Sequence, residues 1–270
     1  MISLGDQIFD SMKHYSSLNA LKIGSRHISY DELNSKALSI AGFLSNHGMV
    51  KRNVGIVTQH SLSAYAGILG TIYAGCTYIP ISPKYPKNRI ANIVKQTEIE
   101  VLVGDESDWG DTSSKLQDLD GVQYVIFPES RKVFLEKPLI GVSESQLANF
   151  EILQNPLKTP ADENVYIMFT SGSTGTPKGV QVTRKNLQSF LNNMMEFIDF
   201  EPGYISAQVH DLSFDFSVFQ VFFPMITGGT NCVVPEEEKF CPSDFIIREE
   251  INLWSSVPTI AEMMNKLSAL

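Results

Sequence analysis

The stretch with the densest set of chemically useful side chains is residues 170–179, Thr-Ser-Gly-Ser-Thr-Gly-Thr-Pro-Lys-Gly. Five of its ten residues carry hydroxyl groups, three are glycine and one is a lysine, Lys178. Glycine lets backbone N–H groups approach an anion closely, and hydroxyl groups add further donors. Because an apolar run (165–169) leads directly into this stretch, a flexible linker fits poorly. The composition therefore favours a polyphosphate-binding loop.

Two common nucleotide-binding motifs do not fit this stretch. The P-loop pattern needs Gly-Lys followed by Ser or Thr, whereas here Pro177 precedes Lys178 and Gly179 follows it. The next residues, Val-Gln-Val at 180–182, favour a strand rather than the helix that a P-loop opens. The dinucleotide pattern G-x-G-x-x-G is also absent here. The sequence therefore predicts a phosphate loop of another type.

A second candidate residue is Asp215, in the segment Phe-Asp-Phe-Ser-Val-Phe-Gln-Val-Phe at 214–222. A carboxylate among apolar side chains is costly to bury unless it meets a cation, so Asp215 could bind a positively charged group. Alternatively, Asp215 could cap a helix over residues 216–226, since aspartate is favoured at that position. The residues alone leave both interpretations open.

The other charged and polar groups predict no site of their own. Lys84, Lys87 and Arg89 lie beside prolines, which indicates surface charges around a turn. The acidic stretch 104–121 has no metal-ligand spacing and is interpreted as a solvated loop. His210 is interpreted as a polar residue at the end of a strand. We therefore predict no metal-binding residues in the chain.

Composition and charge exclude several classes of protein. The 270 residues carry 21 basic and 30 acidic side chains, a net charge of −9. With an isoelectric point near 5.1, a general nucleic-acid partner is not expected. Cys76, Cys232 and Cys241 are odd in number and far apart, which indicates neither a disulfide framework nor a zinc site but a reducing compartment. Because the N-terminus has no basic region before an apolar run, it does not look like a signal peptide, and we predict a cytoplasmic protein.

The elements that must position these residues alternate between strands and helices. This order predicts an α/β fold with mostly parallel sheets flanked by helices. The uncharged run between Arg52 and Lys84 contains four glycines and Pro80, so it favours a buried strand–helix–strand unit over a membrane span, and no membrane partner is predicted. Ser29 and Glu32 form a capping box that predicts a helix to about residue 47, after a hairpin that turns at Gly24-Ser25.

The remaining elements follow from periodicity and turn residues. Strands are expected at 54–58, 77–81, 100–103, 122–127 and 165–170, and helices at 61–74, 88–96, 184–198 and 257–267. Residues 156–162 look like a connection between two halves. We therefore expect a first α/β lobe over 1–157 and a second over 158–270, which carries the phosphate loop and is incomplete at its C-terminal end.

The ten-residue stretch at 170–179 resembles the phosphate loop of the adenylate-forming, or AMP-binding, superfamily. Residues 28–37, 73–90 and 214–222 resemble other motifs of that family in the family's order. The stretch 228–264 is most similar to D-alanine–carrier-protein ligases and to adenylation domains of nonribosomal peptide synthetases. The resemblance covers essentially the whole chain and implies the N-terminal portion of such a domain.

The resemblance implies ATP-dependent activation of an amino acid. The substrate carboxylate attacks the α-phosphorus to give an aminoacyl-adenylate and pyrophosphate, and the acyl group then passes to the phosphopantetheine thiol of a carrier protein. Mg²⁺ accompanies ATP in such reactions. By resemblance, Asp215 would bind the substrate ammonium, Phe216 and Phe219 would face its side chain, and Lys178 would assist catalysis. The residues that the resemblance assigns to the β- and γ-phosphates are Thr170, Ser171, Gly172, Ser173, Thr174, Gly175 and Lys178.

Several family features have no counterpart before Leu270. These are the Thr-Glu motif with its magnesium ligand, the ribose-binding aspartate and the C-terminal domain with its catalytic lysine. We therefore expect a fragment that is inactive alone and needs the C-terminal half of the domain as a partner. A small amino acid such as alanine is favoured as substrate, with threonine or another amino acid left open. The alternatives are an acyl- or aryl-CoA synthetase and a non-catalytic nucleotide-binding or interaction module left by truncation.

Overall fold

The computed structural model describes residues 2–106, 116, 119–133, 135–170, 177–239 and 241–266. Its strands are β1 (Asn19–Ile23), β2 (Arg26–Ser29), β3 (Asn53–Val57), β4 (Thr77–Pro80), β5 (Val101–Gly104), β6 (Tyr124–Phe127), β7 (Ile140–Ser143), β8 (Asn164–Thr170), β9 (Lys178–Thr183), β10 (Ile205–Gln208) and β11 (Thr230–Val233). Its helices are α1 (Leu4–His14), α2 (Tyr30–Asn46), α3 (Leu62–Tyr73), α4 (Lys87–Thr97), α6 (Glu144–Leu147), α7 (Arg184–Phe197), α8 (Ser217–Thr227), α9 (Ser243–Arg248) and α10 (Pro258–Lys266), with a short 3-10 helix η1 (Glu236–Glu238).

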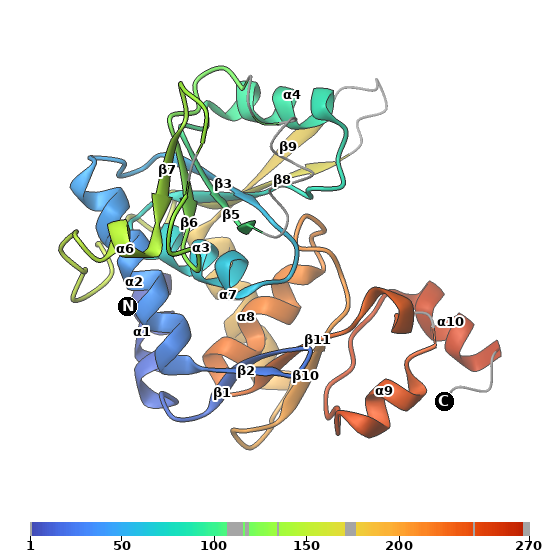
Figure 1. Cartoon of the computed structure of the whole chain (residues 1–270). Helices are drawn as coiled ribbons and strands as arrows, with labels where there is room; N and C mark the ends of the chain where they lie inside the picture. The colour runs from blue at the N-terminus through green and yellow to red at the C-terminus, as the bar shows by residue number, and fades with distance from the viewer. Residues whose placement is uncertain are drawn as a thin grey trace.

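The larger sheet has seven strands in the order β7-β6-β5-β3-β4-β8-β9 (Figure 1). All neighbouring pairs are parallel except β8 and β9, which form an antiparallel hairpin. The residues of β4 and β5 are all buried, as expected for central parallel strands that are covered on both faces. The predicted α/β fold with mostly parallel sheets is confirmed.

The smaller sheet joins strands from opposite ends of the chain. Its order is β10-β11-β1-β2, in which β1 and β2 form an antiparallel hairpin, while β1 pairs in parallel with β11. Leu21 is opposite Asn231 in this pairing. Each sheet therefore takes strands from both sides of the expected boundary at 157/158, and that division into lobes stays a prediction.

The helices fill the space between the two sheets and cover their outer faces. Helix α8 packs on α1, α7, β10 and β11, so it lies at the centre of the molecule (Figure 1). On the other face of the small sheet, Phe245 of α9 packs in a separate apolar cluster with Val209 and Cys232. Helices α9 and α10 project from this side in Figure 1.

The uncharged run before Lys84 forms the predicted strand–helix–strand unit, β3-α3-β4. All 12 residues of α3 are buried. In the described part of the chain, no helix combines the length and the apolar character needed to cross a membrane. The three cysteines are all free.

The predicted helix after Ser29 is confirmed as α2, but its capping box is only half formed. The Ser29 hydroxyl accepts a hydrogen bond from the Glu32 amide at 3.1 Å. The Glu32 carboxylate does not return to the Ser29 amide and instead pairs with Arg26 of the β1–β2 hairpin at 2.9 Å. Because a guanidinium competes well for a carboxylate, the ion pair replaces the second half of the box.

Helices α2 and α3 approach each other closely at Gly70. A Cβ atom at this position would lie 2.7 Å from the Ala37 carbonyl oxygen and 2.8 Å from the Ile40 Cβ. Backbone and Cβ atoms cannot move aside without shifting α2 as a whole. Glycine therefore sets the spacing of this helix pair.

Replacing Gly70 with alanine is expected to destabilise the protein. Overpacking a core contact costs about 1–3 kcal/mol, which lowers the melting temperature of a domain of this size by roughly 3–10 °C. Thermal unfolding followed by circular dichroism measures the shift. The control is Ser35→Ala on the exposed face of α2, and equal melting temperatures for both variants would contradict the close contact.

Candidate functional site

The predicted phosphate loop joins the two strands of the β8–β9 hairpin. Thr170 is the last residue of β8, Lys178 is the first residue of β9, and the two are register partners. Both are exposed. The predicted residues Ser171, Gly172, Ser173, Thr174 and Gly175 lie outside the described residues.

Gly179 allows the hairpin to close tightly behind this loop. It lies opposite Phe169, and a Cβ atom here would stand 2.9 Å from Ile167 Cγ2 and 3.1 Å from the Phe169 ring. A larger residue would therefore displace the end of β9. The glycine positions Thr170 and Lys178 at the same end of the hairpin.

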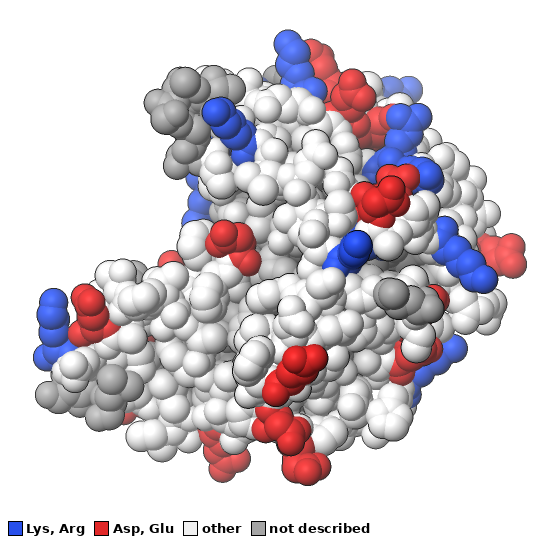
Figure 2. All heavy atoms as spheres, turned by 180° about the vertical axis from the view of Figure 1, so that it is seen from behind, with Lys and Arg blue, Asp and Glu red and all other residues white. Residues whose placement is uncertain are grey.

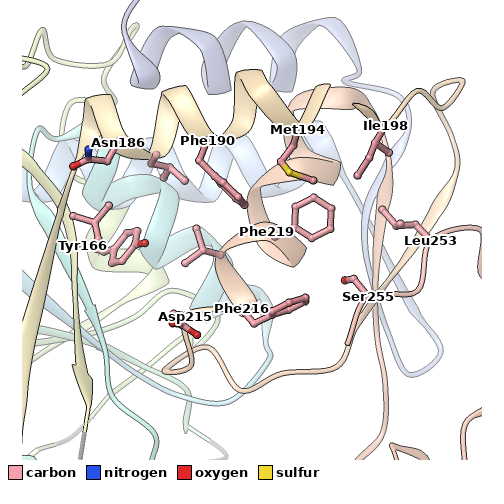
Figure 3. Close-up of a pocket in the computed structure, with 13 residues that line it drawn as sticks. Tyr166, Asn186, Phe190, Met194, Ile198, Asp215, Phe216, Phe219, Leu253 and Ser255 are labelled. Atoms are coloured by element: carbon pink, nitrogen blue, oxygen red, sulfur yellow. The ribbon is translucent and has the colours of Figure 1, made fainter. Parts of the chain in front are cut away.

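A cavity of about 730 Å³ lies below α7 and beside the N-terminal end of α8 (Figure 3). Figure 3 shows the side chains of Phe190, Met194 and Ile198 descending from α7 and its end, opposite Phe216. The wall is apolar except near Asp215, Asn186 and Ser255. The residues that line it are Tyr166, Val182, Asn186, Leu187, Phe190, Met194, Ile198, Asp215, Phe216, Val218, Phe219, Leu253 and Ser255.

Phe216 and Phe219, both predicted from the sequence, are held in this wall by other rings. Phe216 lies 4.9 Å from the His210 ring, and Phe219 stacks on Phe223 with centroids 5.0 Å apart. Phe219 also meets Phe190 edge-on at 6.4 Å. These contacts place an aromatic surface between α7 and α8.

Asp215 precedes α8 but does not cap it. The N-cap residue is Phe216, without a side-chain cap bond, and only the Asp215 backbone carbonyl accepts a bond, from the Val218 amide at 3.1 Å. The helix-cap interpretation is therefore wrong. The Asp215 carboxylate faces the cavity, and it adds to the effect of burial in raising the pKa of the Tyr166 hydroxyl.

A second cavity of about 520 Å³ begins where the first ends. The two share Tyr166, Val182 and Asp215, and the second extends to Thr170 and Arg89. Asp215 thus lies between an apolar cavity and one that reaches the start of the predicted phosphate loop. Lys178 lines neither cavity.

The amide of Gln220 joins the elements around the first cavity. Its Oε1 accepts hydrogen bonds from Gln208 Nε2 at 3.1 Å and from the His210 amide at 3.1 Å. Its Nε2 donates to the Ser255 carbonyl at 2.7 Å. One fully buried side chain of α8 therefore ties the end of β10 to the segment that contributes Leu253 and Ser255.

The loop between β10 and α8 is held from the other side by Asp211. Its Oδ1 accepts a bond from the Ser213 hydroxyl at 2.6 Å, and its Oδ2 accepts one from the Ser82 hydroxyl at 3.1 Å. Burial alone would raise the pKa of Asp211, but these hydrogen bonds outweigh it and lower the pKa. The charged Asp211 connects the loop to the turn that follows β4.

Two histidines lie beside this loop. His210 follows β10, as expected for a residue near a strand end, and burial lowers its pKa. His60 Nδ1 lies 3.0 Å from the Tyr65 hydroxyl, while its Nε2 is buried without a hydrogen-bond partner. Burial lowers the pKa of His60 to about 4, so the ring is neutral at pH 7.

Several lining residues were not predicted from the sequence. Asn186, Phe190 and Met194 recur every four residues on α7, so the helical period could have assigned them to one face. Arg89 lines the second cavity and has a buried Nε, so its assignment to the surface is wrong. No local signal marked it.

The face opposite to the view of Figure 1 is hollowed. Figure 2 shows a broad concavity beside the projecting part of the molecule, with walls of mostly uncharged residues. Within the residues that the structure describes, no three His, Cys, Asp or Glu side chains converge as metal ligands.

Comparison with known proteins gives matches along the chain. The family model described as "AMP-binding enzyme" matches residues 8–270. Syringomycin synthase SyrB1 of Pseudomonas syringae pv. syringae is 27% identical and aligns with 93% of this chain and 38% of its own. The L-proline–[L-prolyl-carrier protein] ligase of Pseudomonas fluorescens is 28% identical, with 97% of this chain and 51% of its own covered.

Solved structures also match this chain over nearly its whole length. The crystal structure of IdnL7 superposes with a TM-score of 0.87 at 27% identity, covering 99% of this chain and 52% of that one. The Vibrio cholerae adenylation domain AlmE, in complex with glycyl-adenosine-5'-phosphate, gives a TM-score of 0.83 at 26% identity, with the same coverage. The chain thus spans about half the length, or less, of these relatives.

Replacing His60 with glutamine is expected to flatten the acid side of the stability profile. The unfolded chain binds a proton at His60 near pH 6.5, whereas the folded chain binds it only near pH 4. Stability is therefore lost as the pH falls through this window, by about 1–2 kcal/mol between pH 7 and pH 5. Thermal unfolding at a series of pH values measures this, with the exposed His27→Gln as control. An unchanged pH dependence in His60→Gln would contradict the assignment.

Proposed function

The chain belongs to the family of AMP-binding enzymes, and we propose that it forms the amino-acid- and phosphate-binding part of an adenylation domain. In the reaction, a substrate carboxylate oxygen bonds to the α-phosphorus of ATP, and the bond from that phosphorus to the β-phosphate oxygen breaks. The products are an aminoacyl-adenylate and pyrophosphate. The observation that carries the proposal is the place of Asp215 between an apolar cavity and one that reaches Thr170.

Asp215 is proposed to bind the substrate ammonium. Its carboxylate lines both cavities and makes no hydrogen bond or ion pair to another described residue, so it is available to a ligand cation. Asp215 is exposed, so its charge needs no partner within the protein, and its carboxylate can pair with an ammonium group that enters the cavity. An acyl- or aryl-CoA synthetase would use a substrate without an ammonium group, and Asp215 argues against that alternative. The printed names of the prolyl-carrier ligase and of AlmE's glycyl-adenylate complex also indicate amino acids.

The substrate side chain is proposed to enter the 730 Å³ cavity. Phe190, Met194, Phe216 and Phe219 give it an apolar wall, which favours an amino acid with an apolar side chain. The volume is larger than an alanine side chain requires. We therefore propose amino acids with larger apolar side chains as the substrate class. The sequence resemblance favoured a small amino acid such as alanine, so alanine is included among the amino acids tested.

Thr170, Lys178 and the Ser/Gly-rich residues between them are proposed to bind the β- and γ-phosphates. Lys178 would stabilise the charge that develops on the leaving pyrophosphate. Among the described residues, no group of three His, Cys, Asp or Glu side chains could hold a metal ion. We propose that Mg²⁺ arrives bound to the phosphates of ATP, because Mg²⁺ in proteins commonly keeps several waters and binds through substrate phosphates together with one or two carboxylates.

Transfer of the acyl group to a carrier-protein thiol is the proposed second step. It rests on the similarity to a prolyl-carrier-protein ligase and to nonribosomal peptide synthetases. A cytoplasmic location remains a prediction from the cysteine content.

Replacing Asp215 with alanine is expected to impair use of the amino acid and to leave ATP affinity nearly unchanged. Because Asp215 is exposed, the loss is that of a charge-assisted hydrogen bond, about 1.5–3 kcal/mol, which corresponds to roughly a 10- to 150-fold lower kcat/KM for the amino acid. Amino-acid-dependent ATP–pyrophosphate exchange, measured on the polypeptide as its gene encodes it, tests this with a panel of amino acids. The melting temperature should change little, because Asp215 caps no helix. A thermal effect without a change in amino-acid dependence would remove Asp215 from the site.

Residues 1–270 alone are expected to show no robust exchange. Positioning of the reacting groups accounts for about 7–11 kcal/mol of a typical barrier, and the matched relatives have about half of their length outside the aligned part. Exchange is measured with residues 1–270 alone and after addition of a second polypeptide that carries the C-terminal part of the domain. Robust exchange by residues 1–270 alone would show that the C-terminal part of the domain is not required for adenylation.

A further inference from the structure

Arg89 is fixed at the edge of the second cavity by an aromatic ring. It lies in the first turn of α4, and its guanidinium carbon is 3.9 Å from the centroid of the Tyr85 ring. The Tyr85 hydroxyl is 2.9 Å from the Ser213 hydroxyl, which donates to Asp211. The ring that supports Arg89 is therefore tied to the loop that carries Asp215.

The charge of Arg89 has no counterpart in the described part of the chain. Its Nε is buried without a hydrogen-bond partner, and none of the ion pairs between described residues includes it. By contrast, Arg26, Arg52 and Arg248 pair with glutamates, and the buried Arg184 donates to two backbone carbonyls. A buried donor without an acceptor is costly, so Arg89 is prepared for an acceptor from a ligand.

The surroundings of Arg89 favour an anion. Arg89 and Thr170 line the same cavity, whose wall beside them is formed by Met168, Phe169 and Val180. The first turn of α4 contains no acidic residue, and the positive end of the helix dipole adds to the charge there. Asp215 lines this cavity too but forms no ion pair with Arg89. A ligand that binds between Asp215 and Arg89 must present a cation to Asp215 and an oxyanion to Arg89.

We propose that Arg89 binds a phosphate oxygen of the pyrophosphate moiety of the nucleotide, a binding role that rests on the proposed function. The planar guanidinium, stacked on Tyr85, can donate two parallel hydrogen bonds to one phosphate group. Lys178 does not line this cavity, but as the register partner of Thr170 it adds a second positive charge at the same end of the hairpin. Two cations exceed what a single carboxylate needs, but they match a polyphosphate.

The test is binding of inorganic pyrophosphate to residues 1–270, measured by isothermal titration calorimetry at low ionic strength. Arg89→Gln is expected to weaken the affinity roughly 10- to 100-fold. Arg89→Lys keeps the charge without the planar fork and is expected to lie in between. The matched control is Lys84→Gln in the turn just before α4, since Lys84 is exposed, pairs with Glu236 and does not line the cavity; its effect should be about twofold or less.

Any of the following outcomes would overturn the proposal. If Arg89→Gln and Lys84→Gln weakened the affinity for pyrophosphate equally, the effect would be one of general electrostatics. If the parent chain bound no pyrophosphate, pyrophosphate would be excluded as the ligand. Weaker binding of an amino acid with unchanged pyrophosphate affinity would assign Arg89 to the substrate carboxylate. Loss of affinity in Lys178→Ala but not in Arg89→Gln would reject Arg89 and leave the proposed function intact, because that function is judged by amino-acid dependence at Asp215. Melting temperatures identify variants that fail to fold, and Arg89→Lys then decides.

Discussion

The buried amide of Gln220 is the interaction on which the first cavity depends. It accepts hydrogen bonds from Gln208 and from the backbone of His210, and it donates to Ser255. Each of these groups would be left unpaired in a low-dielectric interior if one element moved, at about 1–3 kcal/mol for each group. The end of β10, α8 and the segment around Ser255 are thereby restricted to one arrangement. The Asn231 side chain donates to the backbone carbonyl of Gln220 at 2.9 Å, which extends this restriction to β11.

Asp215 is positioned because two polar networks meet at its loop. Gln220 fixes the start of the loop at His210, and Asp211 fixes it to Ser82 beyond β4. The Asp215 carboxylate itself takes part in neither network. Its neighbours are rigid while its own oxygens stay available, which is the arrangement expected where a side chain must meet a ligand without reorganising first.

Features encoded by neighbouring residues could be predicted from the sequence, and features assembled across the chain could not. The buried strand–helix–strand unit and the helix after Ser29 follow from periodicity and a cap, whereas the grouping of Asp215 with Phe216 and Phe219 was expected only from the resemblance of one short segment to the adenylate-forming family. Arg89 was missed because its environment comes from Thr170 and from the loop after β10, more than 80 residues later. The four-residue strands β10 and β11 were missed because so short a run carries little periodic signal.

The pairing of β1 with β11 also has a consequence for the order in which the chain is made. The β1–β2 hairpin leaves the ribosome before its parallel partner, which is synthesised only at Thr230–Val233. At ordinary rates of translation the hairpin waits roughly 10–40 s for that strand, with one edge open to other chains. Helix α1 cannot complete its packing until α8 is also made. The small sheet therefore closes only after β11 has emerged, and the β1–β2 hairpin is the segment that a chaperone would have to protect until then.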